Sequence, residues 1–237
     1  MSANPEIKPL NYLVFGASGF LGSAIVSELE AAGHTVTTAA RGLRADRVDG
    51  HVNLLDENWP SNVRNGLRFD GVVWAQGVNS TGGVLEESPE NLHQVFDANV
   101  VFITNTIKLL VEFDLLRKPA RTVILSSVWQ STARSSKLGY ILAKSALAGL
   151  VPSLAIDLSS HGIAVNAVLP GVIESPMARK NLTPEQLLNV QRETLGGDLA
   201  TANHVAKVTS FLLSPDSVGI NAESISVDQG WSKIRYV

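Results

Sequence analysis

The chain alternates short apolar runs with longer segments in which apolar residues recur at helical spacing. Short runs rich in Val, Ile and Leu are typical of buried strands, and longer amphipathic stretches are typical of helices. The predicted strands cover residues 13–15, 35–40, 51–54, 68–74, 121–126, 163–169 and 223–227. The predicted helices cover residues 23–30, 89–113, 140–160 and a large part of 184–213.

This alternation predicts the fold class. Strands that alternate with helices imply a parallel sheet covered on both faces. We therefore expect one α/β domain over residues 1–237, a doubly wound Rossmann-type sheet of about seven strands with helices on both faces. Ligands of such sheets bind at the carboxyl ends of the strands. Gly77, Ser127 and the Pro170-Gly171 turn all fall at predicted strand ends.

Composition narrows the class of protein. With 237 residues and 45% hydrophobic residues, the chain is long enough for one domain with a full core. A net charge of −3 gives no electrostatic reason to expect a nucleic-acid partner. The absence of cysteine excludes disulfides, zinc-thiolate sites and thiol nucleophiles, and we expect no metal site.

The two ends of the domain and its location follow from local composition. Residues 1–9 are expected to form a flexible N-terminal tail, and residues 172–200 a short substrate lid. Residues 1–8 are polar and show no signal-peptide core, and no uninterrupted apolar run is long enough to span a bilayer. We therefore expect a soluble, cytoplasmic protein with no membrane partner.

A glycine-rich turn at residues 16–22 follows the first apolar run and precedes a helix. Glycine lets the backbone approach a phosphate, and a helix N-terminus offers free N–H groups and a favourable dipole. The turn therefore predicts dinucleotide binding, with an ordinary tight turn as the alternative. The candidate pyrophosphate contacts are Gly16, Ser18, Gly19, Phe20, Leu21 and Gly22.

The spacing of Tyr140 and Lys144 predicts proton-transfer chemistry. Residues four apart lie on one helix face, so the phenol and the ammonium are neighbours. A phenol ionises near pH 10, and a shift of roughly three units needs about 4 kcal/mol. A cation about 4 Å away supplies that order of energy at an effective dielectric of about 20. Ser127, thirteen positions upstream, is placed to hydrogen-bond a substrate oxygen.

Taken together, these motifs resemble the compact, roughly 250-residue branch of the short-chain dehydrogenase/reductase family. The resemblance runs from about Tyr12 to Gly230. It rests on the glycine turn, Asn99, the set Ser127, Tyr140 and Lys144, and the segments 166–171 and 227–230.

The resemblance implies a catalytic tetrad and an oxidoreductase that moves hydride between nicotinamide and a carbonyl or alcohol. Tyr140 would exchange a proton with the substrate oxygen, and Ser127 would polarise that oxygen. Lys144 would bind the nicotinamide ribose and lower the pKa of Tyr140, and Asn99 would hold a relay water. Asn99 is also consistent with an ordinary buried amide, and Ser126 has the same chemistry as Ser127.

The cofactor is predicted from the end of the second strand. An acidic residue there selects NAD, but the chain has Ala40 followed by Arg41, which suits a 2′-phosphate. NADP(H) is therefore favoured, NAD(H) remains possible, and Arg41 as a solvated loop charge is the alternative. The resemblance adds further cofactor contacts at Asn53, Leu54, Ala75, Gln76, Gly77, Pro170, Gly171, Ile173 and Ser175.

The glycine spacing keeps other functions open. Gly19 comes one place earlier than in the compact branch, and Phe20 stands where a glycine is usual. This spacing is that of the extended branch, so a sugar-nucleotide epimerase-like enzyme is one alternative. A non-catalytic dinucleotide-binding sensor or scaffold is another.

The substrate is expected to be a small or polar carbonyl or alcohol. Basic residues near the predicted pocket would suit an acidic substrate, although solvated loop charges are the favoured interpretation; they are Arg134, Lys137, Arg179 and Lys180. The family commonly forms tetramers, and residues 146–158 are apolar all round. We therefore expect a homo-oligomer, a tetramer or a dimer.

Overall fold

The computed structural model describes residues 8–40, 51–54, 56, 58–63, 66–175, 178–179 and 182–234. In this part of the chain, seven parallel strands form one sheet in the order β3-β2-β1-β4-β5-β6-β7. The strands are β1 (Asn11–Phe15), β2 (Thr35–Ala40), β3 (His51–Asn53), β4 (Phe69–Trp74), β5 (Leu116–Leu125), β6 (Ile163–Pro170) and β7 (Ser224–Val227). The strand order reverses between β1 and β4, which opens a crevice at their carboxyl ends.

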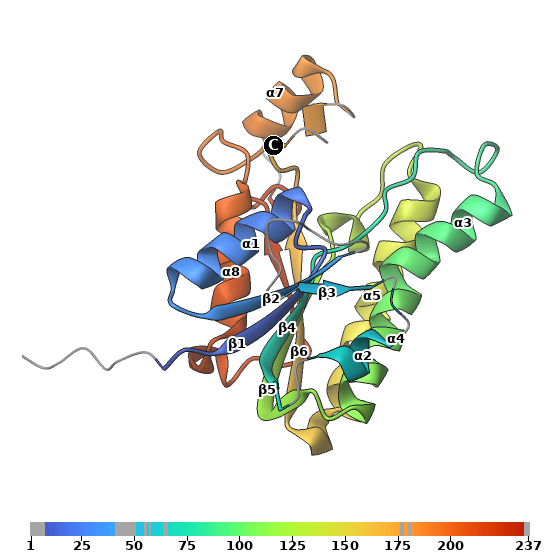
Figure 1. Ribbon diagram of the computed structural model, residues 1–237. Helices are drawn as coiled ribbons and strands as arrows, with labels where there is room; N and C mark the ends of the chain where they lie inside the picture. Colours follow the sequence, from blue (N-terminus) through green and yellow to red (C-terminus); the bar gives the residue numbers. More distant parts are fainter. Residues whose placement is uncertain are drawn as a thin grey trace, which may run out of the picture.

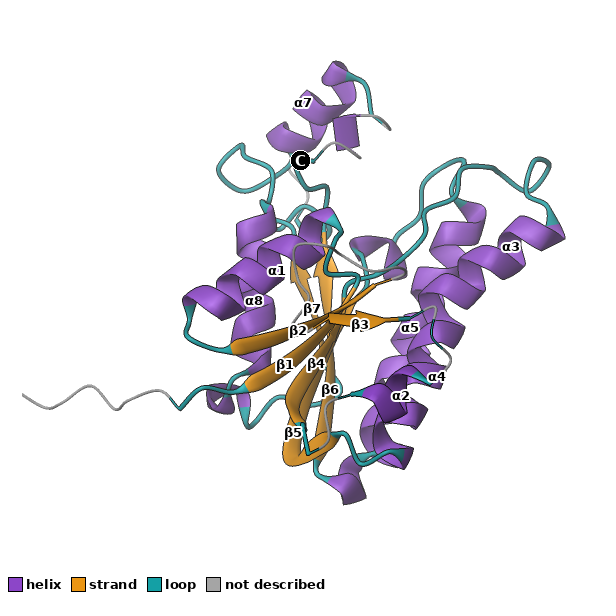
Figure 2. Ribbon diagram, in the orientation of Figure 1, coloured by secondary structure: helices purple, strands orange, loops and turns teal. Residues whose placement is uncertain are grey.

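Helices cover both faces of the sheet, so the molecule has three layers (Figure 1). The helices α1 (Phe20–Ala31) and α8 (Ala202–Leu213) pack side by side on one face. The other face carries α2 (Trp59–Asn62), α3 (Pro89–Phe96), α4 (Phe102–Glu112) and α5 (Leu138–Asp157). The short α7 (Pro184–Arg192) stands beyond the carboxyl edge of the sheet (Figure 2). The predicted fold class is confirmed.

The central strands are largely apolar because both of their faces are buried. In β1, Leu13 and Phe15 belong to the core under α4 and α5, whereas Tyr12 and Val14 belong to the core under α1 and α8. Successive strand residues point to opposite faces, so a strand between two helical layers has no polar side. Trp74, also in the first of these cores, donates its indole N–H to Thr106 Oγ1 at 2.8 Å.

The predicted helix 89–113 contains a local change in geometry. A π-helical turn, η1 (Asp97–Val101), joins α3 to α4, and Asn99 lies at its centre. Single π turns inside helices recur at functional sites. The strand predicted at 121–126 is longer in the structure, where β5 begins at Leu116. The pairing of β5 with β4 shifts in register between Phe69 and Gly71.

Among the described residues, α5 alone is long and apolar enough to cross a membrane by length and composition, with a mean hydropathy of 1.5. The core helix of a doubly wound domain has the same composition. In this structure, α5 buries Ala143, Leu147 and Val151 in the core beneath the sheet.

Candidate active site

The glycine turn is shaped by two very close backbone contacts. Gly16 has φ +74°, and a Cβ built on it would lie 2.5 Å from the backbone nitrogen of Gln76. A Cβ on Gly22 would lie 2.2 Å from the carbonyl oxygen of Gly16. Only glycine is compatible with these contacts. They fix the start of α1 directly against the carboxyl ends of β1 and β4.

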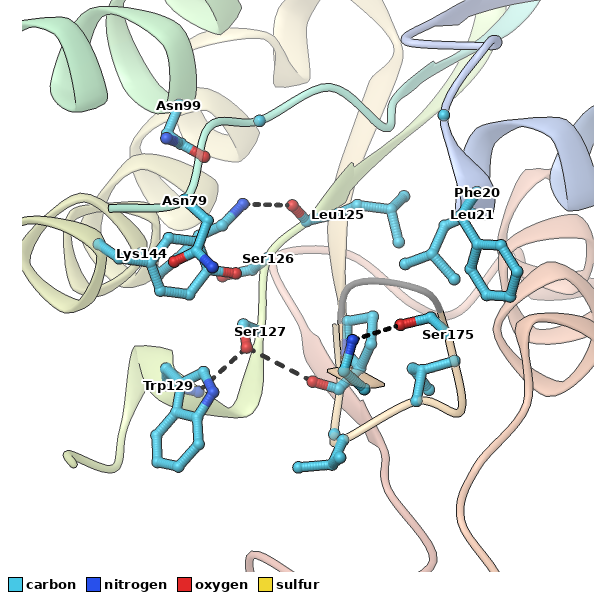
Figure 3. Close-up of a pocket in the computed structure, with 18 of the residues that line it drawn as sticks. Phe20, Leu21, Asn79, Asn99, Leu125, Ser126, Ser127, Trp129, Lys144 and Ser175 are labelled. Carbon is cyan, nitrogen blue, oxygen red and sulfur yellow. Dashed lines mark hydrogen bonds between the residues drawn. The ribbon is translucent and has the colours of Figure 1, made fainter. Parts of the chain in front are cut away.

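Four polar side chains predicted to be catalytic lie around one cavity of about 320 Å³: Asn99, Ser127, Tyr140 and Lys144. Asn99, Ser127 and Lys144 lie on one side of this cavity, and Phe20 and Leu21 from the glycine turn lie opposite (Figure 3). The cavity thus joins the catalytic set to the turn predicted to bind phosphates.

The position of Ser127 distinguishes it from Ser126. The Ser126 hydroxyl donates to Gln130 Oε1 at 2.8 Å, so a neighbouring side chain engages it. Ser127 accepts the backbone N–H of Trp129 at 3.3 Å and forms a hydrogen bond with Tyr140. Of the two hydroxyls, the one at position 127 is therefore the one coupled to the phenol.

Lys144 is buried and anchored to the sheet. Its ammonium donates to the carbonyl oxygen of Leu125, at the end of β5, over 2.9 Å. Burial lowers the pKa of Lys144 to about 8. Its Nζ lies 5.8 Å from the centre of the Tyr140 ring.

The protonation of Tyr140 differs from our expectation. Burial raises the pKa of the phenol, and its hydrogen bond with Ser127 opposes that rise. The predicted lowering by Lys144 is wrong for this structure, because loss of hydration is the largest cause of the shift and the hydrogen bond with Ser127, rather than Lys144, opposes it. A protonated phenol is a proton donor at neutral pH, which suits reduction of a carbonyl.

Asn99 is held by the π turn. Its Nδ2 donates to Val95 O at 2.8 Å and to Val78 O at 2.9 Å. In an unbroken α-helix, the Val95 carbonyl would instead accept the backbone N–H of Asn99. The Oδ1 atom is buried, has no hydrogen-bond partner in the described part of the chain, and faces Gly77 together with Lys144 Nζ. A Cβ on Gly77 would lie 2.7 Å from that Oδ1.

A second unpartnered amide lies beside the glycine turn. Both Nε2 and Oε1 of Gln76 are buried and lack partners within the described residues, and Gln76 lines the cavity. Buried polar atoms in folded proteins nearly always have partners, so such an amide calls for a polar ligand. The narrow glycine turn and this free amide therefore fit a nicotinamide dinucleotide.

The structure gathers most of the remaining predicted contacts around the cavity: Gly19, Phe20, Leu21, Ala75, Gly77, Pro170, Gly171, Ile173 and Ser175. Others do not line it. Gly16 and Gly22 lie beneath the turn, and Ser18 is exposed. Asn53 and Leu54 lie at and just after the end of β3. Arg41 lies outside the described residues, as do residues 1–7 of the predicted tail and Lys180.

The sequence did not identify every group of the cavity. The carbonyl of Leu125, which binds Lys144, carries no side-chain signal. Asn79 and Trp129 also line the cavity, as do Arg134 and Lys137, which the sequence had placed near the predicted pocket. Their chemistry is visible in the sequence, but their orientation depends on how the loop before α3 packs against the start of α5.

Comparison with known proteins identifies the family. Residues 61–232 match the family model described as Enoyl-(Acyl carrier protein) reductase. The 3-oxoacyl-(acyl-carrier-protein) reductase FabG of Escherichia coli is 26% identical over 233 residues, covering 92% of this chain and 95% of FabG. The uncharacterized oxidoreductase YmfI of Bacillus subtilis is also 26% identical, covering 92% of this chain and 97% of YmfI.

Solved structures of other proteins have the same fold as this chain. A short-chain dehydrogenase family protein from Francisella tularensis has a TM-score of 0.81 at 26% identity, over 96% of this chain and all of that chain (100%). The aldohexose dehydrogenase of Thermoplasma acidophilum has a TM-score of 0.83 at 21% identity, over 97% and 96% of the two chains, and shows likeness of fold alone. The chain belongs to the short-chain dehydrogenase/reductase family, whose members are NAD(P)-dependent oxidoreductases.

Proposed function

We propose that the protein is an NADPH-dependent reductase of small carbonyl compounds. The observation that carries this proposal is the single cavity that joins Asn99, Ser127, Tyr140 and Lys144 to the glycine turn. A non-catalytic binding protein needs the turn but has no need of a buried phenol, ammonium and hydroxyl in contact with the same space.

Binding and orientation of the cofactor are assigned to the two sides of the cavity. The backbone around Gly19 to Gly22 would hold the pyrophosphate, and Gln76 would use its free amide toward the nucleoside. The ammonium of Lys144 would donate to the nicotinamide ribose while Leu125 O keeps it in place. When bound, the nicotinamide supplies or accepts the hydride.

The proton is assigned to Tyr140. Its phenol is protonated at neutral pH, as an ordinary phenol is, and burial raises its pKa further, so Oη holds the proton that the carbonyl oxygen needs as it gains charge. Ser127 Oγ donates a second hydrogen bond to the same oxygen. The phenolate is then reprotonated from the side of Lys144, where the unpartnered Asn99 Oδ1 supports a water position.

NADPH rather than NADH is proposed from the sequence at Arg41. A guanidinium pairs with a 2′-phosphate through charge-assisted hydrogen bonds, and no carboxylate precedes it at Ala40 to select the free ribose. The cytoplasmic location, the substrate lid at 172–200 and the homo-oligomer remain part of this proposal. Leu182, Ile173 and Ser175 from that segment line the cavity, which supports the lid.

The test is a fluorescence titration with NADPH and with NADH, followed by reduction of a panel of small ketones and aldehydes. We expect tighter binding of NADPH, and Arg41→Ala should weaken it at least about tenfold while changing NADH binding little. Arg117→Ala is the matched control, because Arg117 is exposed and paired with Asp70 at 3.4 Å.

Other outcomes point to other functions. Binding of both cofactors without turnover of any carbonyl would favour the sensor or scaffold. NAD retained through purification would favour the epimerase-like alternative. Preference for NADH would overturn the assignment to Arg41 and leave the reductase in place.

A further inference from the structure

A buried positive charge lies in the wall of the cavity at Lys137. This residue is the N-cap of α5, has a relative exposure of 6% and lines the same cavity as Tyr140. Its Nζ donates to Asn79 Oδ1 at 3.0 Å, to Ser80 O at 2.9 Å and to Thr81 Oγ1 at 2.9 Å. All three acceptors are neutral, so they hold the ammonium without cancelling its charge.

Arg134 adds a second cation to this wall. Its guanidinium carbon lies 5.9 Å from the centre of the Trp129 ring, and the residue lines the cavity. Within the described part of the chain, neither Lys137 nor Arg134 forms an ion pair. Burial lowers the pKa of Lys137, and the positive charge of Arg134 lowers it further.

Within the described residues, the carboxylate of Glu87 forms no ion pair with either cation, and it is not among the causes that shift the pKa of Lys137. One of its oxygens accepts the backbone N–H of Gly139 at 3.2 Å, and the other accepts from the side-chain amide of Asn91. Two cations that repel each other on the wall of a small cavity make it a focus of positive potential. A negative group bound there would relieve that repulsion.

We propose that Lys137 and Arg134 select carbonyl substrates that carry a negative group, a carboxylate or a phosphate, about one helical turn from the reacting carbonyl. The inference rests on the proposed function. Lys137 is the N-cap of α5, three residues before Tyr140, and both residues line the cavity, which places the negative group about one helical turn from the reacting carbonyl. Arg134 supplies N–H donors to the anion, and Lys137 supplies charge.

The size of the cavity limits the substrate further. A volume of about 320 Å³ lies at the lower end of the range for small-molecule sites, which favours short oxo acids or small ketone phosphates over long chains.

A purely structural role for Lys137 is the competing explanation. Its three hydrogen bonds join residues 79–81 to the start of α5, next to a backbone bridge between Gly82 and Lys137. A structural link would affect charged and neutral substrates alike. The test therefore compares acids with their neutral analogues.

The kinetic experiment uses two pairs of substrates with NADPH: 4-oxopentanoate with its methyl ester, and dihydroxyacetone phosphate with dihydroxyacetone. For each pair, we expect the wild type to have a higher kcat/KM with the charged member. Lys137→Met and Arg134→Gln should each lower the charged-to-neutral ratio by about tenfold or more. Lys108→Met, on the exposed face of α4, is the control and should leave the ratio within about twofold.

A binding experiment keeps the inference separate from turnover. Calorimetric titration of each pair into the Tyr140→Phe protein, with and without NADPH, should show tighter binding of the charged member. Equal binding of both members would overturn the inference. So would a Lys137→Met protein in which the affinity for both members falls by the same factor. Absence of NADPH binding or of all carbonyl turnover would overturn the proposed function instead. The pair with the larger preference identifies the anion as carboxylate or phosphate.

Discussion

Lys144 is a residue of the candidate active site whose burial lowers the stability of the folded protein. Its ammonium is buried and donates to the neutral Leu125 carbonyl, and burial lowers its pKa from 10.5 to about 8. A shift of this size corresponds to roughly 3 kcal/mol of disfavoured charge. The pKa of Tyr140, one turn away, is raised instead, since burial favours the neutral, protonated form of the phenol.

Replacing Lys144 by methionine should reveal this cost as a pH effect. Between pH about 8 and 10.5, the folded protein binds fewer protons at this site than the unfolded chain, so the free energy of unfolding rises with pH there. Below pH 8 the full penalty is present. We expect Lys144→Met to be more stable than the wild type at pH 7, because the buried charge is removed. The Leu125 carbonyl then loses its hydrogen bond, which reduces this gain by about 1–3 kcal/mol.

The measurement is urea unfolding without cofactor at pH 7 and pH 9.5. The free energy of unfolding of the variant should exceed that of the wild type at pH 7, and this difference should be smaller at pH 9.5. A difference that does not change with pH would show that the pKa of Lys144 is not lowered in the folded protein.

The phenol of Tyr140 has its own test. Tyr140→Phe should lower kcat about 10²- to 10⁴-fold, the usual effect of a general acid, while the dissociation constant of NADPH changes less than about threefold. Tyr12→Phe is a matched control, because its buried hydroxyl contacts Leu213 O at 3.4 Å on the other side of the sheet. Turnover that survives in Tyr140→Phe would assign the proton to another group.

At the scale of elements, the turn between β1 and α1 is built by backbone packing rather than by side chains. Gly22 lies in the first turn of α1 against the Gly16 carbonyl, and Gly16 lies against the Gln76 backbone. The cap residue Gly19 contributes no side-chain hydrogen bond, so the first N–H groups of α1 have no side-chain cap. This is the arrangement that a helix needs to bind a phosphate.

Gly22→Ala should therefore disrupt both binding and stability. Its Cβ would meet the Gly16 carbonyl oxygen at 2.2 Å, a contact that requires the backbone to move. We expect loss of NADPH affinity of about tenfold or more and a destabilisation of about 1–3 kcal/mol. Gly219→Ala is the control, because a Cβ there meets nothing within 4 Å. Unchanged NADPH affinity in Gly22→Ala would remove the turn from the cofactor site.

At the scale of the molecule, α5 packs one face against the core and exposes apolar side chains on its other face. Leu147 and Val151 are buried, whereas Ile156 is 73% exposed and Leu142 is 46% exposed. Exposed apolar groups on the helix that also carries Tyr140 and Lys144 are consistent with the proposed homo-oligomer.

Light scattering after size-exclusion chromatography tests this assembly. We expect a dimer or tetramer for the wild type and a smaller species for Ile156→Asp, because a carboxylate in an apolar interface loses hydration without a partner. Lys207→Asp, on the exposed part of α8, is the control. A monomeric wild type would overturn the proposal.

The sequence alone determined the alternation of strands and helices, the candidate residues at the strand ends and the Tyr140–Lys144 spacing, because these depend on residues close in the chain. It also carried the resemblance to the family. The tertiary structure decided what depends on burial and distant contacts: the raised pKa of Tyr140, the π turn at Asn99 and the unneutralised charge of Lys137. No local pattern reports these, since hydration and hydrogen-bond partners are set by segments that meet only in the folded chain.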